Sequence, residues 1–200
     1  MSFPEYLAGC LGLVAGAAAF IYIGMRLCRL LVPGWRGPVA WTGTAICSTV
    51  TALVAAELLG SFGLYRGWPF LAVAVLAALA AWRWMPDPPE DTGVELVHVP
   101  ASAWMTWIGL GVAAVAIAVF SVGVRIKLGT GMTGFDSTWY HGPFAAGFAD
   151  SGHTFQLHQL APQFLTWFYP QNSELIHAMG MVAFGNDLLS PLINLGWMLA

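Results

Sequence analysis

Four long apolar runs limit what this chain can fold into. The hydrocarbon core of a bilayer is about 30 Å thick, so a helix that rises 1.5 Å per residue needs about 20 apolar residues to cross it. The four runs that approach or exceed this length are 6–23, 39–62, 69–84 and 103–124. Lipid offers no water to backbone N–H and C=O groups, and strand-like alternation is absent from these runs, so each is predicted to be a helix. The predicted fold class is an all-α polytopic membrane protein.

Composition favours the same class. Of the 200 residues, 58% are hydrophobic and 8% are charged, whereas soluble domains contain about 25% charged residues. The formal net charge is -3, and the seven Lys and Arg residues form no dense basic patch. Nucleic acid is therefore excluded as a partner, because phosphate binding needs clustered cations. Membrane lipids are the expected surroundings.

The orientation of the chain follows from the Lys and Arg residues of the short loops. If the N-terminus is outside, four of these residues face the cytoplasm and three face outward. The inner set is Arg26, Arg29, Arg36 and Arg83, and the outer set is Arg66, Arg125 and Lys127. This bias predicts a multi-pass protein of the cell (inner) membrane, with the N-terminus and the segment after residue 125 on the extracytoplasmic side.

The chain divides into two halves. Residues 1–100 are predicted to hold three accessory spans and a cytoplasmic connector, and residues 101–200 to begin a second unit. This unit starts with the fourth span, continues through an external loop at 125–171 that carries short interfacial helices, and ends in a helical hairpin. The last apolar stretch, from Leu188, is too short to cross a bilayer. We therefore expect the sequence to be the N-terminal part of a longer protein whose remaining helices pack against it.

Two features inside the spans stand out. Gly12 and Gly16 have the G-x-x-x-G spacing that permits a close helix crossing, although this spacing also arises by chance in glycine-rich helices. Glu57 is predicted to lie deep in the second span, where a carboxylate is functional by default unless it braces neighbouring helices.

Three glycines after the fourth span, Gly129, Gly131 and Gly134, have the G-x-G-x-x-G spacing of a dinucleotide loop. That loop works when a buried strand delivers it and a helix N-terminus receives the phosphates. An apolar helix precedes these glycines, so a nucleotide site is not predicted. Because glycine tolerates positive φ, the glycines are expected to end the helix and turn the chain.

The segment that follows is similar to a known family. The run FDSTWYHGPFAAGFADSG, followed by YPQNSELIHAMG and FGNDLLSPL, resembles the first external loop and next helical hairpin of the GT-C superfamily of polytopic glycosyltransferases. The resemblance is narrower to bacterial relatives of protein O-mannosyltransferases and lipid A aminoarabinose transferases. The stretch AELLGSFGLYRGWPFL also resembles the additional N-terminal helices of some bacterial members. The resemblance implies a GT-C-like helical core that transfers a sugar from a polyprenyl-phosphate donor to an acceptor hydroxyl at the outer membrane face.

The resemblance also implies a catalytic base. In the family, an Asp in the first external loop takes the acceptor proton, and Asp136 holds that position. A solvated turn residue is the alternative interpretation. Many family members carry a second acidic residue directly after the Asp, whereas this chain has Ser137, which leaves dependence on a divalent metal open.

Further residues are candidates for substrate binding. Arg125 and Lys127 could neutralise the leaving lipid phosphate. Tyr140 and His141 are candidates for acceptor contacts or, equally, for headgroup anchors. The resemblance implies that Asn172 and Glu174 contact sugar or acceptor hydroxyls; a carboxylate in the first turn of a helix is also stabilised by the helix dipole. The histidine spacings match no compact metal site, so no metal ligand is assigned.

Two other functions compete with the enzyme. A transporter is suggested by Glu57 within a span and by the glycine-interrupted helices, and a noncatalytic assembly subunit is the third alternative. A transporter is expected to concentrate polar groups in its spans. Here most histidines and polar aromatics gather in one external loop, which favours chemistry at the membrane surface.

Overall fold

The computed structural model describes residues 2–87, 102–131, 133–154 and 171–199. In this part of the chain every regular element is helical. Four helices are long and apolar enough to cross a membrane: α1 (Phe3–Leu31), α2 (Gly37–Ser61), α3 (Gly67–Trp84) and α4 (Ala103–Thr130). The shorter elements are a π-helix, η1 (Ser137–His141), and the α-helices α5 (Gly142–Ser151), α6 (Asn172–Phe184) and α7 (Ser190–Leu199). The predicted class, an all-α polytopic membrane protein, is confirmed.

Glycines with positive φ follow three of these helices. Gly131 adopts φ 72° after α4, Gly152 adopts φ 76° after α5 and Gly185 adopts φ 66° after α6, values that glycine adopts without a steric penalty. Gly131 therefore stops a helix, as predicted for this group of glycines, whereas Gly129 lies within α4. The backbone leaves the helix later than the predicted loop start at 125, because α4 continues to Thr130. Arg125 and Lys127 accordingly lie on α4 and not in a loop.

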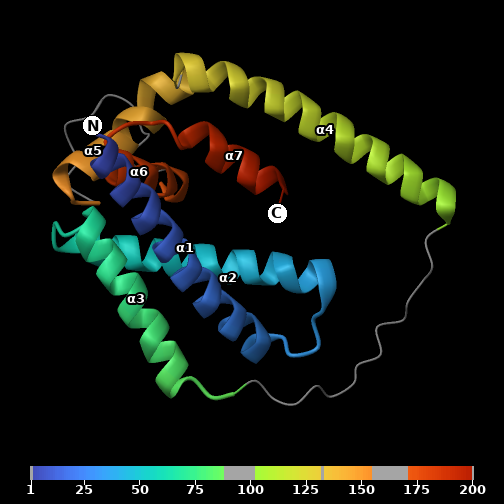
Figure 1. Ribbon diagram of the computed structural model, residues 1–200, viewed down its shortest axis with the longest axis horizontal. Helices are drawn as coiled ribbons and strands as arrows, with labels where there is room; N and C mark the ends of the chain where they lie inside the picture. Colours follow the sequence, from blue (N-terminus) through green and yellow to red (C-terminus); the bar gives the residue numbers. More distant parts are fainter. Residues whose placement is uncertain (1, 88–101, 132, 155–170, 200) are drawn as a thin grey trace.

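Helix α1 packs across both α2 and α3 (Figure 1). Its closest approach to α2 is at Gly24, where a β-carbon would lie 2.7 Å from the backbone nitrogen of Ser48. Gly12 and Gly16, by contrast, face Leu71 of α3 at an ordinary contact distance of 3.9 Å. The close crossing that small residues permit is therefore made at Gly24 and not by the G-x-x-x-G pair.

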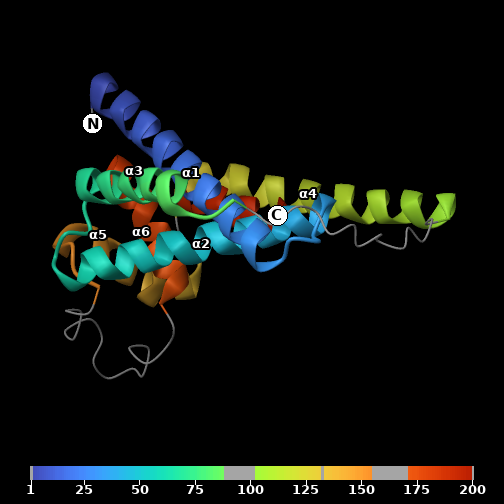
Figure 2. The same cartoon turned by 90° about the horizontal axis from the view of Figure 1, so that it is seen from below.

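The two ends of the helical bundle are held together differently. At one end the Arg26 guanidinium donates hydrogen bonds to the carbonyls of Met85 and Pro86, at 2.9 and 3.0 Å, and lies 3.3 Å from the Asp87 carboxylate. At the opposite end the start of α1, the α2–α3 turn, α5 and α6 lie together (Figures 1 and 2). We call this the α5 end. The placement of these segments on one side agrees with four alternating spans.

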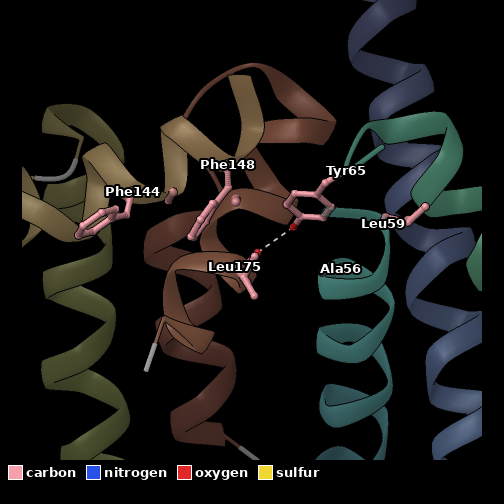
Figure 3. Packing of buried hydrophobic residues seen from close by; sticks show 8 residues of the cluster. Ala56, Leu59, Tyr65, Phe144, Phe148 and Leu175 are labelled. Atoms are coloured by element: carbon pink, nitrogen blue, oxygen red, sulfur yellow. Dashed lines mark hydrogen bonds between the residues drawn. The ribbon is translucent and has the colours of Figure 1, made fainter. Parts of the chain in front are cut away.

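A buried cluster forms the core of the α5 end (Figure 3). Its members come from α2, the α2–α3 turn, α5 and α6: Ala56, Leu59, Tyr65, Phe144, Ala145, Phe148, Leu175 and Ala178. Phe144 and Phe148 are spaced four residues apart and so share one face of α5. The hydroxyl of the fully buried Tyr65 donates to the carbonyl of Leu175 at 2.9 Å. This α5–α6 cluster fixes the two short helices against the spanning helices.

Helix α4 is arranged differently. It extends away from the other helices (Figure 2), and its main packing partner is α7. Val124 is the one buried residue of α4. Before the last two turns, which carry Arg125 and Lys127, the surface of the helix is mainly apolar and exposed, as expected of a helix that faces lipid.

Candidate functional site

The segment that carries the predicted base is a turn of π-helix. The N–H of Gly142 donates to the carbonyl of Ser137, five residues earlier, and α5 follows without a break. Such turns insert an extra residue into a helix and occur frequently at functional sites. Asp136 directly precedes this turn and His141 ends it, so the two lie five residues apart, about one π-helical turn.

Asp136 is open to its surroundings. Its side chain is exposed, and in the described part of the chain the structure shows no hydrogen bond or ion pair for its carboxylate. It lines neither of the two cavities described below. The carboxylate is therefore accessible to a substrate, but the described residues do not fix its orientation.

His141 and Glu174 form the central contact of the site. Nδ1 of His141 contacts Oε1 of Glu174, and Oγ of Ser173 donates to Oε2 of the same carboxylate at 2.8 Å. The side chain of Glu174 is 4% exposed and that of His141 is 35% exposed. Two predicted substrate-binding residues are thus brought together from segments 33 residues apart. In this arrangement Glu174 is a partner of His141, not an open group that faces hydroxyls.

A second histidine lies beside this pair. His177 follows Glu174 by nearly one turn on α6, and its Nδ1 is buried without a hydrogen-bond partner among the described residues. Burial lowers the pKa of His177; the neighbouring Glu174 acts in the opposite direction and His141 adds to the lowering. A neutral imidazole is therefore favoured at this position. Within the described residues no group of three or more His, Cys, Asp or Glu side chains is placed to hold a metal ion.

Tyr140 supports the ring of His141. The two ring centroids are 4.0 Å apart, and Tyr140 is half-buried against the α5–α6 cluster. Trp139 precedes it and packs against Phe135 with centroids 5.2 Å apart. Tyr140 therefore connects the buried cluster to the histidine, and its main contacts are with protein.

The other predicted residues lie farther from this pair in the fold. Asn172 is exposed and begins α6. Arg125 and Lys127 are exposed on the last two turns of α4. Lys127 lines a cavity of about 730 Å³ between α4 and α7. These three side chains are accessible to ligands, but the structure gives them no contact with the His141–Glu174 pair.

Glu57 does not occupy the depth that the sequence suggested. It is exposed and lies four residues before the end of α2 at Ser61. Its carbonyl accepts a hydrogen bond from the Ser61 hydroxyl at 2.8 Å. Its location near the end of a span removes the argument for a carboxylate deep in the membrane.

Arg66 has a structural role that the sequence did not indicate. Its guanidinium donates to the carbonyls of Ala149 and Ser151 at the end of α5, at 3.1 and 3.2 Å. The last carbonyls of a helix lack partners within the helix and favour basic side chains. Arg66 also borders a cavity of about 430 Å³ together with Asp150 and Asp187. Its place in the short α2–α3 turn was the one signal of this role in the sequence.

Comparisons with known proteins found no match for this chain. No family model, curated protein or solved structure matches this chain. The resemblance to GT-C glycosyltransferases accordingly depends on the quoted residues alone.

Proposed function

We propose that this chain belongs to a membrane glycosyltransferase of GT-C type. It transfers a sugar from a polyprenyl-phosphate donor to an acceptor hydroxyl, with Asp136 as the general base. The observation that carries the proposal is an exposed carboxylate, without a partner among the described residues, six residues beyond the end of a membrane-spanning helix. That carboxylate lies within the run of residues that resembles the first external loop of the family.

The chemistry is a single displacement at the anomeric carbon. The acceptor oxygen forms a bond to C1 of the sugar, the bond from C1 to the phosphate oxygen breaks, and the lipid phosphate leaves. The acceptor proton passes to the Asp136 carboxylate. A hydroxyl is a weak nucleophile, and general base catalysis typically accelerates such steps by about 10² to 10⁴-fold.

The proposed location is the extracytoplasmic surface of the inner membrane. The positive-inside bias favours an outer N-terminus, and the α5 end of the bundle lies on the same side as the start of α1. A phosphate linked to a polyprenyl chain stays at headgroup level, next to the ends of the spanning helices. Arg125 and Lys127, on the last turns of α4, are cations that the leaving phosphate could reach.

The decisive experiment replaces the base. Asp136→Asn in the natural gene product should reduce sugar transfer from a panel of polyprenyl-phosphate donors by roughly 100-fold or more. The assay compares membranes that contain equal amounts of each variant. Asp150→Asn is the matched control, because Asp150 is also an exposed carboxylate and lies near the end of α5, and it should leave the rate unchanged.

Two outcomes would contradict the proposal. Transfer that is undiminished in Asp136→Asn would remove the assigned base. A wild-type protein that transfers no sugar from any donor of the panel would favour the noncatalytic assembly role.

A further inference from the structure

The protonation of the His141–Glu174 pair decides what the exposed side of His141 can do. Nδ1 of His141 is occupied by the Glu174 carboxylate, so Nε2 is the nitrogen left for a ligand. In the described part of the chain Nε2 makes no hydrogen bond, and it is absent from the buried atoms that lack partners. About a third of the His141 side chain remains exposed.

Two arrangements of protons give the pair no net charge. In the first, an imidazolium contacts a carboxylate; in the second, a neutral imidazole contacts a carboxylic acid. Nδ1 takes part in the contact in both, and Nε2 carries a hydrogen in both. In either arrangement the open nitrogen is therefore a hydrogen-bond donor.

A third arrangement would make Nε2 an acceptor, and the burial of Glu174 disfavours it. A neutral imidazole that donates from Nδ1 to a carboxylate leaves a net negative charge on a residue that is 3% exposed. Burying an uncompensated charge is strongly unfavourable. The groups that face His141 are Glu174 and His177 from α6, with Tyr140 on its own segment. Burial lowers the pKa of His177, which disfavours the imidazolium that would supply the missing positive charge.

We propose that Nε2–H of His141 is the donor that binds the phosphate of a prenyl-phosphate lipid, and that Glu174 is the positioning residue that keeps this donor protonated and oriented. The assignment rests on the proposed function for the identity of the lipid. A protonated imidazole and a phosphate oxygen form a charge-assisted hydrogen bond, which is among the strongest that proteins make. It replaces the expectation that His141 contacts the acceptor and that Glu174 contacts hydroxyls.

The position of the pair suits a phosphate that is attached to lipid. His141 directly precedes α5, which the α5–α6 cluster holds against the ends of α2 and α3. A prenyl-phosphate headgroup lies at the same level as the ends of the spanning helices.

The test measures binding and not transfer. The probe is a fluorescent short-chain prenyl phosphate, titrated against the full chain in detergent and followed by anisotropy. His141→Asn retains an amide near Glu174 but loses the donor at Nε2, and should weaken binding roughly tenfold or more. His141→Gln carries an amide N–H at about the reach of Nε2 and should weaken binding less. Thermal unfolding of each variant shows whether the fold is kept.

Two further ligands distinguish the source of the phosphate. The matching prenol, which has no phosphate, should bind equally to the wild type and to both His141 variants. Inorganic phosphate should compete only weakly, because it lacks the lipid tail. Competition by inorganic phosphate at the affinity of the lipid would overturn the lipid assignment, and equal binding of prenyl phosphate to all variants would overturn the site.

The positioning role of Glu174 has a separate test in the conservative variant. Glu174→Gln removes the carboxylate that Nδ1 of His141 contacts and should weaken prenyl-phosphate binding, whereas Glu174→Asp keeps a carboxylate and should weaken it less. Equal losses in the two variants, with the fold kept in both, would overturn the role assigned to Glu174.

The same variants separate this inference from the proposed function. Asp136→Asn should reduce transfer by roughly 100-fold or more, whereas the His141 variants should weaken the binding of prenyl phosphate. Binding that depends on His141 in a protein without transfer would support the phosphate site and contradict the enzyme. Transfer that depends on Asp136, with binding unchanged in the His141 variants, would support the enzyme and contradict the phosphate site.

Discussion

Helix α4 and the α5–α6 cluster show opposite relations between apolarity and burial. Helix α4 is a continuous apolar helix of 28 residues, yet Val124 is its one buried side chain. Helices α5 and α6 are 10 and 13 residues long and contribute Phe144, Phe148 and Leu175, which are almost completely buried. In a membrane protein the most apolar surface faces lipid, since lipid tails are as apolar as leucine and give helices no hydrophobic reason to associate.

Polar contacts account for much of the difference. At the α5 end, side chains reach between elements: Tyr65 to Leu175, Arg66 to Ala149, and His141 to Glu174. In the described part of the chain, the side-chain hydrogen bonds of α4, such as that from Thr130 to the carbonyl of Ile126, stay within the helix. Directional contacts therefore define the α5 end, whereas α4 is defined mainly by its own backbone.

The largest expected effect is a loss of stability when a buried ring is removed from the α5–α6 cluster. Phe148→Ala removes a ring that is 1% exposed at the centre of the α5–α6 cluster. The cavity it leaves should lower the free energy of unfolding by about 3–5 kcal/mol. Phe120→Ala on α4, where the ring is 46% exposed, is the control and should change it by less than about 0.5 kcal/mol. Unfolding in detergent, followed by circular dichroism, measures both; equal losses would show that α4 is packed as tightly as the cluster.

Alanine substitutions at two glycines, one on α1 and one on α4, test the same difference in packing. A methyl group at Gly24 would overlap the backbone of Ser48 at 2.7 Å, whereas Gly111 on α4 has no atom within 4 Å. Gly24→Ala should therefore destabilise the protein by about 1–3 kcal/mol, because α1 and α2 must move apart. Gly111→Ala should be neutral or slightly stabilising, since alanine favours helix. The comparison of thermal midpoints in one detergent checks this, and a tolerated Gly24→Ala would argue against the close crossing.

The hydrogen bond from Tyr65 should have a smaller effect. Burial and the nearby Glu57 raise the pKa of Tyr65, so its hydroxyl stays protonated and donates to Leu175. Tyr65→Phe should lower the free energy of unfolding by about 1 kcal/mol. Tyr22→Phe is the control, because no hydrogen bond of the Tyr22 hydroxyl occurs among the described residues. Similar losses in both variants would show that the hydrogen bond from Tyr65 to Leu175 adds no stability beyond that of an unpaired hydroxyl.

The smallest expected effect is a pH dependence. The pKa of His177 lies below its ordinary value of 6.5 because burial disfavours the imidazolium. The unfolded chain therefore binds a proton more readily than the folded chain as the pH falls below 6.5. The contribution of His177 to stability is complete above that value and is lost as the pH falls toward its folded pKa. Thermal midpoints at about pH 7.5 and 5.5 should differ less in His177→Leu than in the wild type. An unchanged difference would show that His177 is not the source of the pH dependence of stability.

The spanning helices could be predicted from the sequence because hydropathy summed over about 18 residues is a strong signal. The third span, expected at 69–84, is the helix Gly67–Trp84. The ends of helices were less predictable. Arg125 and Lys127 suggested a loop, but both residues are compatible with a helix, and the backbone turns only where Gly131 adopts a positive φ.

The sequence offered candidate residues for a site but not their arrangement. Asp136 and Glu174 were candidates because of the resemblance to the GT-C family, and His141 was a candidate for an acceptor contact or a headgroup anchor. The contact between His141 and Glu174 joins segments 33 residues apart and depends on a π-helical turn that has no sequence signature. The contact of Arg66 with the end of α5 spans more than 80 residues and could not be foreseen for the same reason.

The length of α4 bears on the depth in the membrane of the π-helical turn that follows it. Its 28 residues extend about 42 Å at a rise of about 1.5 Å per residue, which exceeds an apolar layer of about 30 Å. An upright α4 would therefore raise the π-helical turn clear of the acyl chains, whereas a strongly tilted one would lower it among them. The tilt of α4 therefore sets the depth in the membrane of the segment that follows it.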